Sequence, residues 1–214
     1  MPLYSIDRFD KKSFLSVWKI TETEEELIKE LSVPEDELKD ILLSPSSKRR
    51  LERLAVRALI NVSFDKRQYL GYEENNRPYL KNFPGDISIT HAGEFACLYV
   101  HENMNTGVDI ESLKRSFHAV EARILSPYEV SYLEEDEEEK QKQLCLIWCA
   151  KEAIYKVVNQ RNVDFMKDIE VKKFSLKPKG KLSGKFINSE DNSKIKLTLH
   201  YKFIGDYALV WVAR

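Results

Sequence analysis

The sequence predicts an α+β protein made of two similar halves, each with an antiparallel sheet and packed helices, related by a pseudo-twofold axis. The main observation is a repeat at an offset of 112 residues: residues 93–100 read GEFACLYV and residues 205–212 read GDYALVWV. In each copy a glycine and an acid stand between two β-rich runs, which indicates a hairpin, and a helical segment comes before it. Chance similarity of eight small and apolar residues is the alternative explanation.

The predicted halves are residues 1–103 and 104–214. Apolar residues make up 43% and charged residues 32% of the chain, as in ordinary globular proteins, and the net charge of −1 argues against a protein that coats nucleic acid. The N-terminus has no apolar signal region, and no apolar run approaches the ~20 residues of a membrane helix. Three cysteines form neither a disulfide framework nor a zinc motif, so we expect a cytoplasmic protein without a membrane anchor.

In the first half, the residues through Ile20 have strand character, and Thr21 or Thr23 is placed to cap a helix that Pro34 interrupts. Apolar residues at helical spacing predict a second helix from the serines after Pro45 to Ile60. Its polar face is basic and carries Lys48, Arg49, Arg50, Arg53 and Arg57. A basic helix face is most often solvated surface.

In the second half, alternation of apolar and acidic residues predicts a strand at 107–111. Ser126-Pro127-Tyr128-Glu129 reads as a capping box, a long helix is expected from about Lys140 to Val158, and alternation over 194–203 predicts another strand.

Two pairs of charged residues suggest chemistry. Asp109 and Glu111 share one face of the strand, and because neighbouring carboxylates repel, they suggest a cation between them. Glu152 and Lys156 are four apart on one helix face. Taken singly, the first pair is more often a solvated strand face, and the second is more often a surface salt bridge.

Together, G-V-D-I-E at 107–111 and W-x-x-K-E-A-x-x-K at 148–156 resemble the two signature motifs of the 4′-phosphopantetheinyl transferases. Two weaker matches precede them in family order. Asn76-Arg77-Pro78 resembles the family's G-K-P loop with Asn-Arg in place of Gly-Lys, and residues 87–92 resemble its N-(I/L/V)-S-H-S strand, where Thr90 keeps a hydroxyl and His91 an imidazole.

The resemblance implies the 4′-phosphopantetheinyl transferase fold of the Sfp type, a monomeric internal pseudodimer with coenzyme A bound between its halves. Residues 1–103 would bind the phosphates of coenzyme A, and residues 104–214 would hold the metal site and the catalytic helix. The residues implied in coenzyme A binding are Lys48, Arg49, Arg53, Arg77, Thr90, His91, Lys151 and Lys156.

The implied activity is that of a holo-[acyl-carrier-protein] synthase. The 4′-phosphopantetheine of coenzyme A is transferred to a serine of an apo acyl or peptidyl carrier protein, releasing adenosine 3′,5′-bisphosphate. Mg²⁺, with Mn²⁺ as an alternative, would be held by Asp109, Glu111 and Glu152. Glu152, or a metal-bound water beside it, would take the serine proton, and Lys156 would stabilise the leaving phosphate; with Asp109 these form the implied catalytic set. Fatty acid, polyketide and nonribosomal peptide synthesis all remain open as the pathway.

Two other functions fit the residues. Acids with a lysine also suit another magnesium enzyme acting on phosphate esters, such as a nuclease. A non-catalytic module that binds carrier proteins or nucleotides is the second.

Overall fold

The computed structural model describes residues 2–31, 33–189 and 191–214. The chain divides into two compact units, residues 1–103 and 104–214, which are described separately. Both units combine helices with antiparallel strands, so the predicted α+β class is confirmed. None of the described helices combines the length and the apolar character that crossing a bilayer requires.

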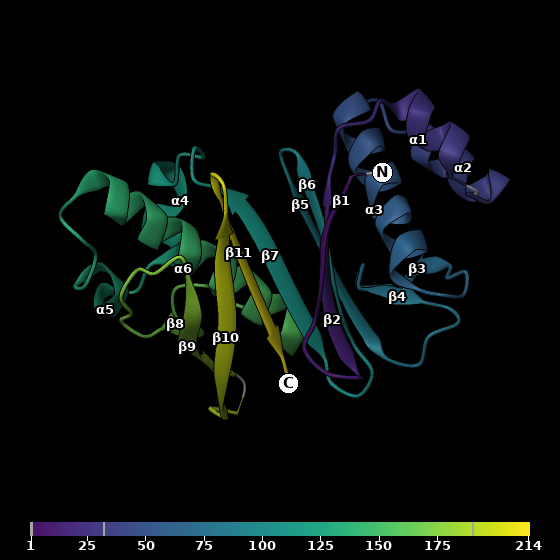
Figure 1. The fold of residues 1–214 in the computed structure, drawn as a ribbon. Helices are drawn as coiled ribbons and strands as arrows, with labels where there is room; N and C mark the ends of the chain where they lie inside the picture. The colour runs from purple at the N-terminus through teal and green to yellow at the C-terminus, as the bar shows by residue number, and fades with distance from the viewer. Residues whose placement is uncertain (1, 32, 190) are drawn as a thin grey trace. The chain divides into compact units, whose positions relative to one another are not determined.

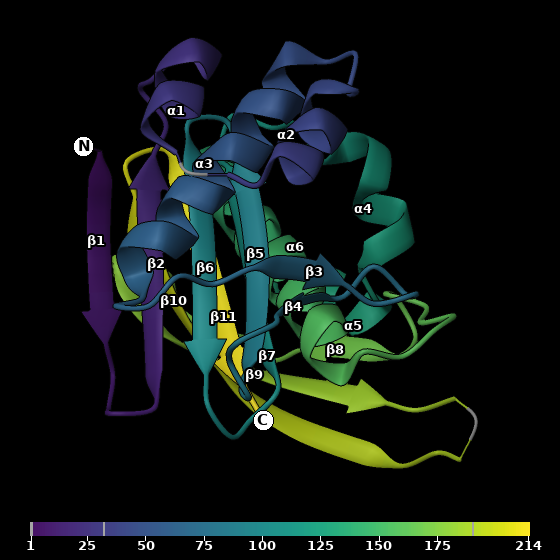
Figure 2. The same cartoon turned by 90° about the vertical axis from the view of Figure 1, so that its right-hand side faces the viewer.

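The first unit is a four-stranded antiparallel sheet, in the order β1-β2-β6-β5, with helices on one face (Figures 1 and 2). A two-stranded hairpin, β3-β4, stands beside it. The strands are β1 (Leu3–Arg8), β2 (Ser13–Lys19), β3 (Leu70–Tyr72), β4 (Pro78–Leu80), β5 (Asp86–Ala92) and β6 (Phe95–His101). The helices are α1 (Glu24–Glu30), α2 (Glu35–Leu42) and α3 (Ser47–Ser63).

Local sequence signals set the helix starts of this unit. Thr23 caps α1 through a capping box with Glu26, Pro34 takes the N-cap position of α2, and the Ser46 hydroxyl accepts a hydrogen bond from the Arg49 N–H at the start of α3. The apolar face of α3 packs on the sheet to form one core. Pro34 therefore separates two helices, because proline fits a helix start but not a helix interior.

The second unit is a five-stranded antiparallel sheet, in the order β7-β11-β10-β9-β8 (Figure 1). The strands are β7 (Thr106–Ser112), β8 (Ile169–Val171), β9 (Lys179–Ile187), β10 (Lys194–Ile204) and β11 (Tyr207–Ala213). The helices are α4 (His118–Ile124), α5 (Pro127–Val130) and α6 (Glu137–Val158).

The long helix α6 organises the second unit. Asp136 caps its start, three acids occupy its first turn, and Asn159 ends it in the left-handed conformation at φ +50°. Its apolar side forms a separate core with the inner face of the sheet. The helix begins at Glu137, three residues before the expected start, because the acidic run supplies both the cap and the first turn. The capping box at Ser126 is confirmed, but it opens only the single turn of α5.

The two units share a connectivity. In each, a strand leads through helices to a long helix and then to a hairpin, giving the strand orders β2-β6-β5 and β7-β11-β10. Gly93 and Gly205 lie in the turns of these hairpins, with φ of 55° and 53°, a backbone region that glycine enters without steric cost. The repeated sequence thus forms the same local structure twice, and a twofold relation between the units stays a prediction.

Candidate active site

The site begins with a close approach between α6 and β7. A Cβ atom on Gly107 would lie 1.9 Å from the carbonyl oxygen of Ala153 in α6. Only glycine permits this approach, which places the helix backbone directly over the strand. The first residue of the G-V-D-I-E motif therefore makes room for the helix that carries Glu152 and Lys156.

Asp109 and Glu111 project from β7 on the same side as Gly107, towards α6, as strand periodicity requires. Asp109 is only 6% exposed, and the alternate residues Val108 and Ile110 are buried as well. The alternative of a solvated polar strand face is therefore wrong. These carboxylates lie beneath a helix, where burying a charge costs free energy unless other charges compensate.

Lys156 compensates for Asp109. Its Nζ lies 2.8 Å from Asp109 Oδ1 and 2.8 Å from the carbonyl oxygen of Val108. Burial by itself would lower the pKa of the Lys156 ammonium, but the charge of Asp109 outweighs it and the pKa is raised. Lys156 is thus held as a cation against the strand.

Glu111 is held by an aromatic and a cationic group. The indole Nε1 of Trp148 donates a hydrogen bond of 3.1 Å to Glu111 Oε1, and Arg115 forms an ion pair with the same oxygen. The Arg115 guanidinium also lies over the Trp148 ring, 4.9 Å from its centroid. Burial and then the charge of Asp109 raise the pKa of Glu111, and Arg115 opposes them. Arg115 was missed by the sequence analysis, because one arginine four residues beyond a strand acid carries no distinctive signal.

Glu152 is the acid whose charge is least compensated. No hydrogen bond or ion pair joins its carboxylate to another described side chain. Burial, and then the charge of Asp109, raise the pKa of Glu152 to about 7, although Lys156 acts against them. Asp109, Glu111 and Glu152 are therefore close enough to repel one another.

A family model described as the 4′-phosphopantetheinyl transferase superfamily matches residues 105–212, which is just over half of the chain. The chain belongs to the 4′-phosphopantetheinyl transferase superfamily. No curated protein matches the sequence. The matched region contains β7 and α6, so the acids and the lysine described above lie within the family domain. As a member of this superfamily, the chain is a transferase of the phosphopantetheinyl type.

The carboxylates of this transferase suit a hard divalent cation by their chemistry. Burial and the charge of Asp109 raise the pKa of Glu111 and of Glu152, so the three acids form an excess of negative charge that such a cation offsets. The Oδ2 atom of Asp109 is buried and accepts no hydrogen bond from the described residues, while Oδ1 binds Lys156. No three acidic, histidine or cysteine side chains of the described chain are gathered closely enough to enclose a metal ion as they stand. The residues thus fit a divalent cation in charge and donor type without forming a closed cage.

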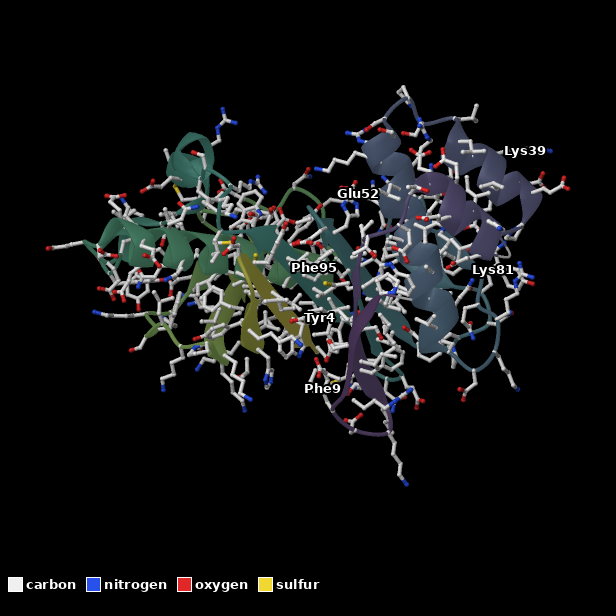
Figure 3. All side chains as sticks on the ribbon, turned by 45° about the horizontal axis from the view of Figure 1, so that its top comes forward. Tyr4, Phe9, Lys39, Glu52, Lys81 and Phe95 are labelled. Atoms are coloured by element: carbon white, nitrogen blue, oxygen red, sulfur yellow. The ribbon has the colours of Figure 1, made fainter. Side chains whose placement is uncertain are left out.

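In the first unit, the buried carboxylate of Glu52, a residue labelled in Figure 3, lies between two predicted phosphate-binding residues. Glu52 Oε1 lies 3.8 Å from Lys48 Nζ, and Glu52 Oε2 lies 3.4 Å from His91 Nδ1. The side chains of Lys48 and His91 are 72% and 46% exposed, and Arg49 beside them is exposed. The start of α3 and the end of β5 thus present an accessible basic group.

The other predicted phosphate contacts of this unit have acidic partners or lie elsewhere. Arg53 binds the Asp40 carboxylate and its carbonyl oxygen, and Arg77 binds both oxygens of Asp86 at 3.2 and 2.6 Å. Thr90 is 7% exposed and, as the strand neighbour of His91, points to the opposite face of the sheet. The structure therefore brings Lys48 and His91 together at Glu52, leaves Arg49 exposed next to Lys48 in the chain, and gives Arg53 and Arg77 acidic partners.

Asn76, which stands where the family loop has glycine, adopts a φ of +65°. Asparagine enters this left-handed region more readily than most residues. The loop therefore has a left-handed residue at this position even though asparagine replaces the family's glycine.

The expected phosphate contact of Lys151 needs correction. Its side chain is fully buried, and Nζ donates to four oxygens of the protein at 2.6–2.8 Å. Because an ammonium has three protons, this group has no donor left for a phosphate. Lys151 and Glu152 are neighbours in the motif, so the sequence did not show that their side chains have different surroundings. Glu152 faces the acids of β7, whereas Lys151 points into the interior.

Proposed function

We propose that the protein transfers the 4′-phosphopantetheine group of coenzyme A to a serine of an apo acyl or peptidyl carrier protein in a Mg²⁺-dependent reaction. The second product is adenosine 3′,5′-bisphosphate. The observation that supports this best is the juxtaposition, inside the matched family domain, of Asp109 with Lys156 at 2.8 Å and with Glu152, the least compensated acid.

Mg²⁺, or Mn²⁺ in its place, would be held by Asp109, Glu111 and Glu152, and when bound it would offset the negative charge of the diphosphate under attack. Glu152, or a water beside it, would accept the proton of the attacking serine as the general base. Such a base contributes roughly 10²–10⁴-fold to the rate.

Lys156 and Arg115 complete the charge balance. Lys156, held as a cation by Asp109, would stabilise the phosphate that leaves with adenosine. Arg115 and Trp148 hold one oxygen of Glu111, which keeps this carboxylate oriented. Each of these contacts comes from a side chain of the second unit, which we propose carries the metal site and the catalytic helix.

For the phosphates of coenzyme A we propose the exposed group Lys48, Arg49 and His91 in the first unit. Its ammonium and guanidinium groups are accessible, and both bind phosphate oxygens well. Arg53, Arg77 and Thr90 stay predicted contacts. Both arginines would first have to exchange their aspartates for phosphate.

The decisive test is intact-protein mass spectrometry. Apo carrier proteins of fatty acid, polyketide and peptide synthesis are incubated with the protein, coenzyme A and Mg²⁺, and in parallel with EDTA. We expect a gain of one phosphopantetheine on at least one carrier, and none with EDTA. Plain DNA in the same buffer serves as the competing substrate: cleaved DNA with unmodified carriers would establish a phosphodiesterase instead.

A further inference from the structure

A buried and fully hydrogen-bonded ion pair of the second unit lies outside the proposed chemistry. Lys151 and Glu129 are both 0% exposed and are joined by a contact of 2.8 Å between Nζ and Oε2. Lys151 Nζ also donates to the carbonyl oxygens of Ile124, Phe165 and Ile169 at 2.6, 2.7 and 2.7 Å. The ammonium is therefore bound on every side.

Glu129 is equally well satisfied. Its Oε1 accepts a hydrogen bond of 2.8 Å from the N–H of Val171, and its Oε2 accepts one of 2.7 Å from the N–H of Ser126 within the capping box of α5. Burial lowers the pKa of Lys151, and Glu129 opposes that effect. Removing two charges from water costs about as much as the pair regains, so the pair is not retained for a large net gain in stability.

The pair joins four segments at one point of α6. Ile124 ends α4, Glu129 lies in α5, Phe165 lies in the connection after α6, and Ile169 begins β8. All are attached to α6 at the residue directly before Glu152. The orientation of that helix turn is thus set by contacts on the side of α6 that faces away from β7.

A second path leads from the pair to Glu111. Lys151 holds the backbone of Phe165, whose ring lies between two aromatic residues of α6, with centroid distances of 6.1 Å to Trp148 and 5.6 Å to Tyr155. Trp148 in turn donates its indole hydrogen bond to Glu111. Displacing Phe165 would therefore change the packing that orients the Glu111 partner.

We propose that Lys151 and Glu129 are positioning residues: their buried pair holds α6 and Trp148 so that Glu152 and Glu111 are placed to bind a divalent cation. The inference rests on the proposed function for the roles of these two acids. Neither residue of the pair touches the reacting groups.

The test measures cation binding separately from catalysis. Tb³⁺ is a hard, oxygen-seeking cation that luminesces when a nearby tryptophan is excited, and Trp148 lies beside Glu111. In the double variant Lys151→Met/Glu129→Gln we expect the Tb³⁺ affinity to fall at least fivefold. The Mg²⁺ concentration for half-maximal transfer should rise to a similar extent, and the KM for coenzyme A should change less than twofold.

A matched control comes from the first unit, where Arg57 Nε lies 2.7 Å from Glu37 Oε1 and the Arg57 side chain is 8% exposed. Arg57→Met/Glu37→Gln removes this ion pair, in which Arg57 is buried and Glu37 is partly exposed, and should leave the Tb³⁺ affinity at the wild-type value. A Tb³⁺ affinity of Lys151→Met/Glu129→Gln within twofold of wild type overturns the proposal, as does an equal loss in the control.

If the double variant does not fold, Glu129→Gln alone decides, because it keeps the size of the side chain and leaves Lys151 its three carbonyl acceptors. Weakened Tb³⁺ binding then supports the proposal, and unchanged binding overturns it. A wild-type protein without saturable Tb³⁺ luminescence also overturns it. A wild-type protein that binds Tb³⁺ but transfers no phosphopantetheine would disprove the proposed function and leave the positioning role standing.

Discussion

At the scale of single residues, the site is defined by how each acid is compensated. Asp109 has Lys156, Glu111 has Arg115 and Trp148, and Glu152 has only the surrounding charges. The three carboxylates are chemically alike, but the structure gives them different partners. Removing one charge should therefore have different consequences for stability at different positions, even where the effect on activity is the same.

Two nearly isosteric substitutions test this difference. We expect Glu152→Gln and Asp109→Asn each to abolish transfer. Glu152→Gln should stabilise the metal-free protein by about 1 kcal/mol, because it removes a buried repulsion. Asp109→Asn should destabilise it by about 1–3 kcal/mol, because Lys156 loses its charged partner. Urea unfolding in EDTA measures both values, and near wild-type turnover of either variant with Mg²⁺ would contradict the assignment.

At the scale of elements, the distance between α6 and β7 decides whether Glu152 of the helix lies near Asp109 and Glu111 of the strand. A surface helix and a strand meet through side chains, but here the backbone of α6 rests on Gly107. Since Lys156 reaches both Asp109 and the carbonyl oxygen of Val108, the helix cannot move outward without breaking these contacts. Gly107 therefore lets α6 pack close to β7, and this close packing brings Glu152 and Lys156 to the acids of the strand.

Gly107→Ala should push α6 away from β7 and cost about 2–3 kcal/mol of unfolding free energy, with a large loss of kcat. Gly205→Ala is the matched control. Its Cβ would meet nothing within 4 Å, and the φ of +53° alone should cost about 1 kcal/mol without loss of activity. Denaturant titration and transfer assays compare the two, and equal losses of kcat would show that the close approach is unimportant for the site.

At the scale of the molecule, each unit has an apolar core of its own, and among the described residues these two cores share no member. The first lies between α3 and the four-stranded sheet, and the second lies between α6 and the five-stranded sheet. Each unit therefore has its own apolar burial, which is the main source of folding free energy. Weakening one core should therefore promote local unfolding of that unit while the other unit stays folded.

Leu54 and Leu146 are fully buried, one in each core. Leu54→Ala and Leu146→Ala should each destabilise the protein by about 2–5 kcal/mol through loss of burial and creation of a cavity. Hydrogen exchange followed by mass spectrometry should show the greater loss of protection in residues 1–103 for the first variant and in residues 104–214 for the second. Identical patterns in both variants would contradict independent cores.

The sequence by itself determined what depends on local periodicity and capping: the α+β class, a helix cap at Thr21 or Thr23, the capping box at Ser126, the strand of the G-V-D-I-E motif and the family resemblance. These features are written in residues close together along the chain. Tertiary structure alone decided the partners of each charge. It buried Lys151 against Glu129, paired Arg53 with Asp40 and Arg77 with Asp86, and placed Arg115 on Glu111. A lysine's sequence neighbours do not reveal whether it faces water or the interior, because that depends on segments folded against it from elsewhere in the chain.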